Sequence, residues 1–405
     1  MEADMKPSIV LLLSLALLSC NQVEAPLADL AKVEKNLAFT CKHEIIPAPP
    51  AETELLFDYA RWLQKDNQLS SDPLIYAEVE RLYRIAAGSR HFKASINLQN
   101  GGLRGLFRVS GEEYLRLSQQ LITSGVATGN YLVGVFLEHG AAGLEKNTEM
   151  SLRYFRKAAD EGSSQAQFHL GNKLAPVDIA PYVAEQMRSC AAQQLHGEAA
   201  RKLAVHFSIE ERYQEAVNAF QMGVAAGDEI SASFLEHGYL GPEPDDKFNY
   251  LAQSKDVERA NRYQITGRVL SNYSYANPKV PEINDIVPLP PAKLPQWDGK
   301  LQWLEAYLAN VPPEKPTEAL IVRLAQAKGL DPATGKPLPG SLAFSQADLH
   351  PRRSYTGELC LVSGYWTAFE FLSKSAVDRP TARYSGSGKV MLPLLIRNYN
   401  LQGSG

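Results

Sequence analysis

Side chains able to do covalent, metal or phosphate chemistry are present, but their spacing assembles no recognised catalytic motif. A zinc-protease helix needs a second histidine three residues after a His-Glu pair, and His43-Glu44 is followed by Ile-Ile-Pro. The Gly-x-Ser-x-Gly nucleophile elbow is absent from the sequence. Gly335-Lys336 lacks both the first glycine and the following hydroxyl residue of a phosphate-binding loop. We therefore expect no enzymatic activity, no metal ion and no cofactor.

Aromatic and cationic residues near the C-terminus are candidates for a different task, the binding of a protein partner. Tryptophan, tyrosine and arginine contribute much of the binding energy at protein interfaces. The candidates are Arg352, Arg353, Tyr365, Trp366, Arg379 and Arg383. The alternative is that the aromatic residues pack a local core and the arginines only keep the surface soluble.

The N-terminus carries a targeting signal. The apolar run Ile9–Leu18 is ten residues long, whereas a transmembrane helix needs about 20, so the run fits a signal peptide. It ends in Leu-Leu-Ser-Cys, which resembles the lipobox of bacterial lipoproteins, with Cys20 as the lipidated residue. This resemblance implies removal of residues 1–19, and Asn21 after the cysteine implies an outer-membrane anchor facing the periplasm. The alternative is an ordinary cleaved signal with an incidental cysteine.

Composition, net charge and cysteine count limit the possible classes of protein and the number of disulfides. The chain has 405 residues, 45% of them hydrophobic and 21% charged, with a formal net charge of −4. These values argue against a disordered chain, and the charge gives no sign of nucleic-acid binding. The cysteines are Cys20, Cys41, Cys190 and Cys360. If Cys20 carries lipid, at most one disulfide forms within the chain, and spacing does not say which pair forms it.

The middle of the chain contains internal repeats of helical hairpins. Each copy has a helix-forming stretch, a glycine and a second stretch with small residues. We expect the glycine to end the first helix in a left-handed conformation, and Tyr83, Phe155 and Phe220 to fill the gaps between helices. The predicted turn glycines, 30 to 37 residues apart, are Gly88, Gly125, Gly162, Gly197 and Gly227. The clearest copy, residues 129–171, contains Tyr-Phe-Arg-Lys-Ala-Ala-Asp-Glu-Gly and resembles the Sel-like repeat, a relative of the tetratricopeptide repeat. The resemblance implies a mainly α fold, a right-handed helical-hairpin solenoid with a concave binding surface, and the alternative is an unrelated helical bundle.

The chain is therefore predicted to contain five parts. They are a signal peptide (1–19), a tether (20–50), the solenoid (51–275), a Pro-rich linker (276–298) and a small α+β C-terminal lobe (299–405). The linker is either a semi-rigid spacer or a strap along the solenoid. Periodicity predicts helices at 300–311 and 317–328, and the Gly-rich tail predicts short strands at 359–366 and 389–399.

Taken together, these features resemble a group of Sel-like-repeat envelope lipoproteins of proteobacteria. The segments that carry the resemblance are the lipobox, the repeats, Leu289–Lys300, Lys328–Pro337 and Cys360–Trp366. Several members of this group act as immunity proteins against type VI secretion phospholipase effectors of the phospholipase D type. The resemblance implies stoichiometric inhibition of a cognate toxin by protein–protein contact. The alternative is an envelope scaffold or adaptor that organises cell-wall or secretion components.

Overall fold

The computed structural model describes residues 37–175, 180–342 and 344, together with the backbone of four short strands further on. The chain divides into two compact units, Met1–Ala38 and Phe39–Gly405. The architecture and the candidate site discussed below belong to the second unit.

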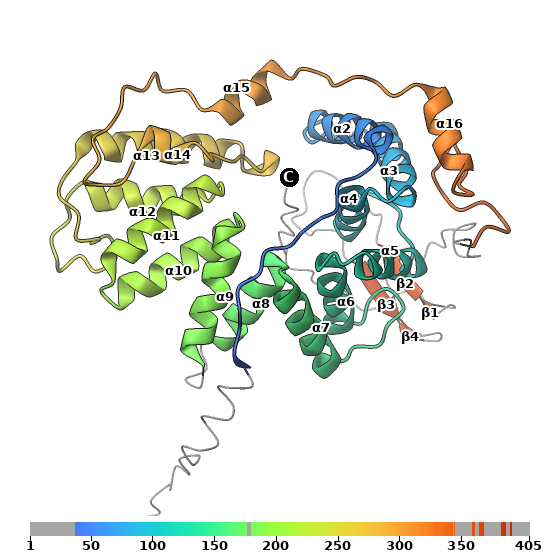
Figure 1. Ribbon diagram of the computed structural model, residues 1–405, viewed down its shortest axis with the longest axis horizontal. Coiled ribbons are helices and arrows are strands. Elements are labelled where there is room, and N and C mark those ends of the chain that lie inside the picture. Colours follow the sequence, from blue (N-terminus) through green and yellow to red (C-terminus); the bar gives the residue numbers. More distant parts are fainter. Residues whose placement is uncertain are drawn as a thin grey trace, which may run out of the picture. The chain divides into compact units, whose positions relative to one another are not determined.

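Consecutive helices of the repeat region pack against one another as a solenoid of helical hairpins (Figure 1), which confirms the predicted mainly α fold. None of the described helices is both long and apolar enough to cross a membrane. The helices of the repeats are α2 (Ala51–Asp66), α3 (Pro73–Gly88), α4 (Phe92–Leu103), α5 (Gly111–Thr123), α6 (Thr128–His139), α7 (Thr148–Glu161), α8 (Ser164–Leu174), α9 (Pro181–Gln193), α10 (Gly197–Ile209), α11 (Tyr213–Ala225), α12 (Glu229–Tyr239) and α13 (Val257–Asn272).

Local sequence explains where most of these helices begin. A side chain just before the first turn accepts a hydrogen bond from a backbone N–H that the helix itself leaves unpaired. Asp72 does this for α3, Ser110 for α5 and Asp228 for α12. At two helices the cap is a histidine: Nδ1 of His91 accepts from Ala94 N at 3.0 Å, and His196 caps α10 in the same way.

Two of the five glycines predicted at the turns between helices do not occupy the left-handed turn position. Gly125, Gly162 and Gly227 do adopt left-handed backbone conformations, with φ of +75°, +113° and +86°. At the other two turns the left-handed residues are Arg90 and Leu195, so the predictions for Gly88 and Gly197 are wrong. Gly88 is instead the last residue of α3, where a Cβ would lie 3.0 Å from the Leu330 side chain. Close packing, rather than the turn, explains that glycine.

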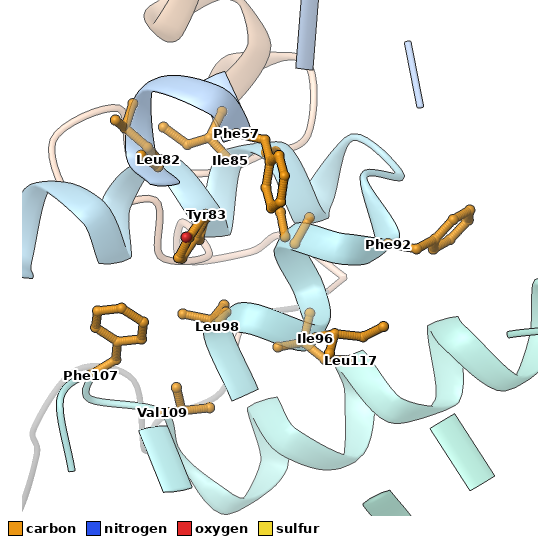
Figure 2. Close-up of a cluster of buried hydrophobic side chains, with 14 of the residues drawn as sticks. Phe57, Leu82, Tyr83, Ile85, Phe92, Ile96, Leu98, Phe107, Val109 and Leu117 are labelled. Carbon is orange, nitrogen blue, oxygen red and sulfur yellow. The ribbon is translucent and has the colours of Figure 1, made fainter. Parts of the chain in front are cut away.

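The buried apolar side chains form two clusters, one at each end of the repeats. The first cluster involves α2 to α6, and Figure 2 shows Phe57, Tyr83 and Phe107 within it. The second involves α10 to α13, with Phe220 at its centre. Tyr83, Phe155 and Phe220 are fully buried, as the repeat pattern predicts. The clusters also contain residues from outside the repeats, because chain segments from both sides pack onto the solenoid.

The first of these segments is residues 39–50, here called the N-terminal strap. It runs past α8 toward α2 (dark blue in Figure 1). A disulfide joins Cys41 to Cys190 of α9. The half-buried carboxylate of Glu44 accepts hydrogen bonds from the N–H and hydroxyl of Thr128, at 2.6 and 2.8 Å. The expectation of a free tether is therefore wrong for residues 39–50, because long-range contacts that composition does not reveal hold them on the repeats.

The second segment is residues 276–342, here called the C-terminal strap. It contains the short helices α14 (Ile283–Ile286), α15 (Gln302–Ala309) and α16 (Glu318–Gln326), and the last two match the predicted helices. Val280 to Val287 pack into the cluster of α10 to α13, and α16 with Leu330 packs into the cluster of α2 to α6. The Pro-rich segment is thus a strap rather than a free spacer. Leu301, Ile321, Leu324, Ala325 and Leu330 belong to the core clusters of the repeats, so the predicted lobe boundary at 299 is wrong.

Beyond the strap, the backbone forms two antiparallel two-stranded sheets. Strand β1 (Leu359–Cys360) pairs with β4 (Lys389–Val390), and β2 (Gly364–Thr367) pairs with β3 (Ala382–Ser385). The predicted strands at 359–366 and 389–399 correspond to β1, β2 and β4, and β3 was not predicted.

Candidate partner-binding site

Three distant parts of the chain border one recess. Its volume is about 590 Å³, and it is lined by α2, by the turns before α8 and α10, and by the C-terminal strap around α15. The charged residues of the lining are Asp58, Arg61, Lys65 and Lys279. The recess therefore holds three cationic side chains and a single carboxylate, although the whole chain is slightly acidic.

The two lysines of the recess have backbone partners but no ion-pair partners. Nζ of Lys65 donates to Tyr307 O at 3.3 Å, and Nζ of Lys279 donates to Ala226 O at 2.7 Å. Among the described residues, neither lysine has a carboxylate within 4.0 Å. Burial lowers the pKa of Lys279 to about 8 and also lowers the pKa of Lys65. The fold thus holds two partly buried ammonium groups without neutralising them, which raises the local positive potential.

Aromatic side chains form the remaining wall of the recess. Trp303 and Tyr307 of α15 stack with ring centres 4.9 Å apart, and Tyr273 meets both rings edge-on. From α2, Trp62 also lines the recess, and its buried indole N–H has no hydrogen-bond acceptor among the described residues. Such rings give broad apolar contact area with little side-chain entropy to lose.

Helix α15 is apolar, yet none of its residues is buried. Leu308 is 63% exposed, and Val311 just beyond the helix is 76% exposed. In contrast, α16 in the same strap buries Ile321, Leu324 and Ala325. An apolar helix that the fold leaves uncovered is typical of a protein interaction surface.

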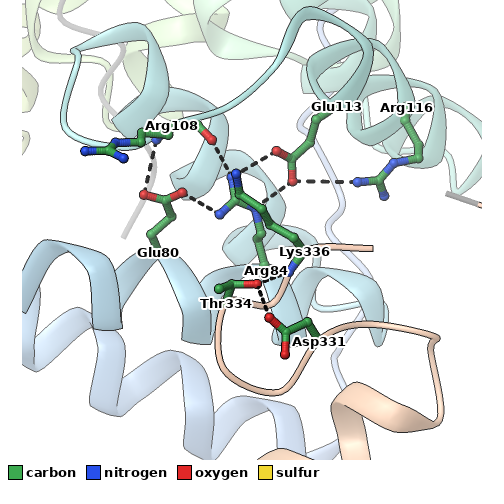
Figure 3. A network of polar contacts seen from close by, with 8 residues as sticks. All are labelled: Glu80, Arg84, Arg108, Glu113, Arg116, Asp331, Thr334 and Lys336. Atoms are coloured by element: carbon green, nitrogen blue, oxygen red, sulfur yellow. Dashed lines mark hydrogen bonds and ion pairs between the residues drawn. The ribbon is translucent and has the colours of Figure 1, made fainter. Parts of the chain in front are cut away.

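The far end of the strap is fixed by a buried polar network (Figure 3). The guanidinium of Arg84 donates two hydrogen bonds to Glu113, at 2.8 and 3.0 Å, and also pairs with Glu80. The strap turn around Gly335 packs directly on Arg84, because a Cβ at Gly335 would lie 2.7 Å from the Arg84 Cβ. Nε of Arg81 donates to the carbonyl of Pro332 in the same turn. These contacts hold the strap beside α3. Helix α15 has lighter contacts: Leu304 packs against the cluster of α10 to α13, and Lys65 of α2 donates to Tyr307 O.

The described part of the chain contains two separate clusters of side chains that could ligate a metal ion. One includes the disulfide, whose sulfurs are not available as thiolate ligands. The other is Glu185, His206 and Glu210, and Arg212 donates to both glutamates at 2.9 and 3.0 Å. The guanidinium already neutralises these carboxylates, so the cluster reads as an ion-pair network.

None of the predicted site residues is among the described residues that line this recess. Cys20, Arg352, Arg353 and Arg379 lie outside the described residues. The backbone places Tyr365 and Trp366 in β2 and Arg383 in β3, with Trp366 opposite Arg383. The sequence alone did not reveal the group formed by Arg61, Lys65, Lys279, Trp303 and Tyr307, since these residues come together only through folding. One available signal was the helix at 300–311, whose apolar residues are more numerous than one buried face requires.

The repeats and their two straps define a helical-repeat protein, a solenoid of helical hairpins. A domain family of unknown function, DUF6396, matches residues 231–338, a range that includes α12, α13 and most of the C-terminal strap. The immunity protein PA5088 from Pseudomonas aeruginosa superposes with a TM-score of 0.51 at 23% identity, covering 62% of this chain and 94% of that one.

Two further solved structures are more distant in shape. The immunity protein Pa5087 from Pseudomonas aeruginosa has a TM-score of 0.49 at 23% identity, with 63% of this chain and 95% of that chain covered. A Sel1 repeat protein from Oxalobacter formigenes has a TM-score of 0.34 at 20% identity, with coverage of 58% and 89%. No curated protein sequence matches the chain. The superposition with PA5088 confirms the predicted resemblance at the level of the fold.

Proposed function

We propose that the protein is an immunity lipoprotein that binds a toxin and neutralises it by forming a stoichiometric complex. The observation that carries this proposal is the likeness in fold to the immunity protein PA5088, over nearly the whole length of that chain. The uncovered helix α15 and the cationic, aromatic recess beside it support binding as the mode of action. No catalytic step is part of the proposal.

The proposed toxin is a type VI secretion phospholipase effector of the phospholipase D type. This finer part of the proposal rests on the sequence resemblance to envelope lipoproteins of that role. The lipobox at Cys20 supports an outer-membrane anchor facing the periplasm. An anchored inhibitor meets a lipid-attacking enzyme at the membrane surface, where tethering raises its effective concentration.

The decisive experiment uses the reading frame next to this gene. Its product is exported to the periplasm of a heterologous host, and growth is followed with and without this protein. Relief of killing by this protein, but not by PA5088 expressed at the same level, is the expected result. With purified components, phospholipase activity should fall linearly and reach zero at one equivalent of this protein. Toxicity that this protein does not relieve, or no toxicity at all, would favour the envelope scaffold instead.

The anchor is tested separately from the toxin. The full chain is expressed in a bacterial host, extracted with detergent and analysed by mass spectrometry. The expected N-terminus is Cys20 carrying lipid, and Cys20→Ala should remove the lipid mass and release the protein into the periplasmic fraction. Cleavage with an unmodified cysteine would show an ordinary signal peptide and leave the toxin-binding proposal standing.

A further inference from the structure

The recess contains more positive charge than the fold uses. Elsewhere in the described structure, several arginines are matched to carboxylates, among them Arg84 to Glu113 and Arg212 to Glu185. Lys279 is matched to a single backbone carbonyl, and Lys65 to one carbonyl and to the face of the Tyr307 ring, 4.6 Å from the ring centre. An ammonium group can donate three hydrogen bonds, so each lysine retains donor capacity that a carboxylate could fill.

Uncharged groups in and beside the recess also remain available to a ligand. The indole N–H of Trp62 is buried and has no acceptor in the part of the chain that the structure describes, although buried donors are normally satisfied. Leu308 and Val311 beside the recess are exposed apolar residues, and Trp303 and Tyr307 present stacked rings. A suitable ligand therefore brings hydrogen-bond acceptors and negative charge into the recess, and apolar side chains onto α15.

We propose that the recess receives an acidic and apolar segment of the partner protein, with carboxylates entering beside Lys65 and Lys279 and apolar side chains packing on α15. This inference rests on the proposed function, because it names the chemistry of the toxin surface that the immunity protein recognises. Charge complementarity of this kind speeds association and fixes the register of the complex.

A protein segment fits these observations better than a membrane surface does. The cations line a recess bordered by α15 and the repeat turns, whereas a bilayer presents its headgroups on a flat surface. The apolar residues lie on the exposed side of a short helix, which matches the mixed apolar and polar character of protein interfaces.

The first test uses a peptide as the probe, so that it does not depend on identifying the toxin. A synthetic octapeptide of alternating glutamate and leucine is titrated into the full-length protein, and affinity is followed by calorimetry and tryptophan fluorescence. The same peptide with lysine in place of glutamate is the charge control, and phosphatidylglycerol vesicles test lipid binding. We expect saturable binding of the glutamate peptide alone. Equal binding of both peptides, or binding of vesicles only, would overturn the inference.

Variants then locate the binding. Lys65→Gln combined with Lys279→Gln should weaken the glutamate peptide at least about tenfold, whereas Asp58→Asn should strengthen it by removing the one carboxylate of the lining. Lys146→Gln combined with Lys247→Gln makes the same change in net charge at exposed positions outside the recess, and should have little effect. Circular dichroism checks that each variant folds. Equal weakening by both lysine pairs would show a non-specific charge effect.

The same variants in the toxin-protection assay separate the two proposals. If the wild-type protein does not bind or neutralise the neighbouring gene product, the proposed function fails, whatever the peptide result. If the wild-type protein protects and the Lys65→Gln/Lys279→Gln variant protects equally well, the function stands and the recess is not the contact surface. Loss of protection by this variant, with protection retained by the Lys146→Gln/Lys247→Gln control, supports both.

Discussion

Arg84 and Lys279 are both cations within the fold, and the difference between their surroundings separates two uses of charge. Arg84 has two carboxylate partners, Glu80 and Glu113. Burial alone would lower its pKa, but the carboxylates reverse the direction and raise it. Lys279 has one carbonyl partner, and burial lowers its pKa to about 8. A buried cation that is neutralised by carboxylates is compatible with a stable fold. A buried cation without a counter-charge opposes folding, and a bound ligand can supply the missing negative charge.

The two helices of the C-terminal strap repeat this contrast in apolar terms. Helix α16 buries three side chains against α3 and neighbouring helices, and so fixes the strap. Helix α15 buries none and leaves Leu308 exposed. One strap therefore combines a segment that stabilises the fold with a segment available to a partner.

The largest expected effect comes from breaking the paired region. Glu113→Ala leaves the buried guanidinium of Arg84 without its two-fold partner and should destabilise the protein by about 3–5 kcal/mol. Glu149→Ala removes the exposed partner of Arg153 and should change stability by less than about 1 kcal/mol. Urea unfolding of both variants tests this. Equal losses would mean that burial does not set the importance of these pairs.

Breaking the covalent contact of the N-terminal strap should have a somewhat smaller effect. Cys41→Ser combined with Cys190→Ser opens a link between residues 149 apart and should cost about 2–4 kcal/mol, because the unfolded chain gains freedom. Unfolding in the presence and absence of reductant checks this: reductant should destabilise the wild-type protein and leave the double variant unchanged. A reductant effect of equal size on the double variant would place the cause elsewhere.

The sequence predicted the repeats well because their signals are local. Helix periodicity and small residues lie within each hairpin, and Tyr83 and Phe220 are buried where the repeat pattern places them. Glycine was a less certain guide, since Gly88 serves the close approach of Leu330 and the left-handed turn falls on Arg90. A glycine can be required for a left-handed backbone conformation or for close packing against a neighbouring side chain, and only the folded structure shows which.

The straps and the recess were beyond reach of the sequence because they depend on long-range contacts. Cys41 and Cys190 are 149 residues apart, and spacing left the choice among three cysteines open. Lys65 and Lys279 meet in the recess from opposite ends of the repeat region. Neither lysine is unusual in its own stretch of sequence. Their significance is that neither ammonium has a carboxylate within 4.0 Å among the described residues, and only the folded chain defines that distance.

The smallest expected effect sharpens the comparison, because it runs against the usual outcome of substitution. Lys279→Met should stabilise the protein by about 2 kcal/mol at pH 7, since it removes a cation that is costly to bury and loses one hydrogen bond. The folded pKa of Lys279 is about 8 and the ordinary value is 10.5. Between these values the unfolded state binds a proton that the folded state does not, so wild-type stability rises with pH across this window. The stability advantage of Lys279→Met is therefore full below pH 8 and shrinks toward pH 10.5.

The neighbouring His196 does not titrate in this window. Its pKa is lowered to about 4, mainly by burial and also by the charge of Lys279. Unfolding of wild type, Lys279→Met and the exposed control Lys247→Met from pH 7 to 10 measures the difference. If Lys279→Met is less stable than wild type by an amount that does not change with pH, Lys279 stabilises the fold. The contrast with Arg84 would then disappear.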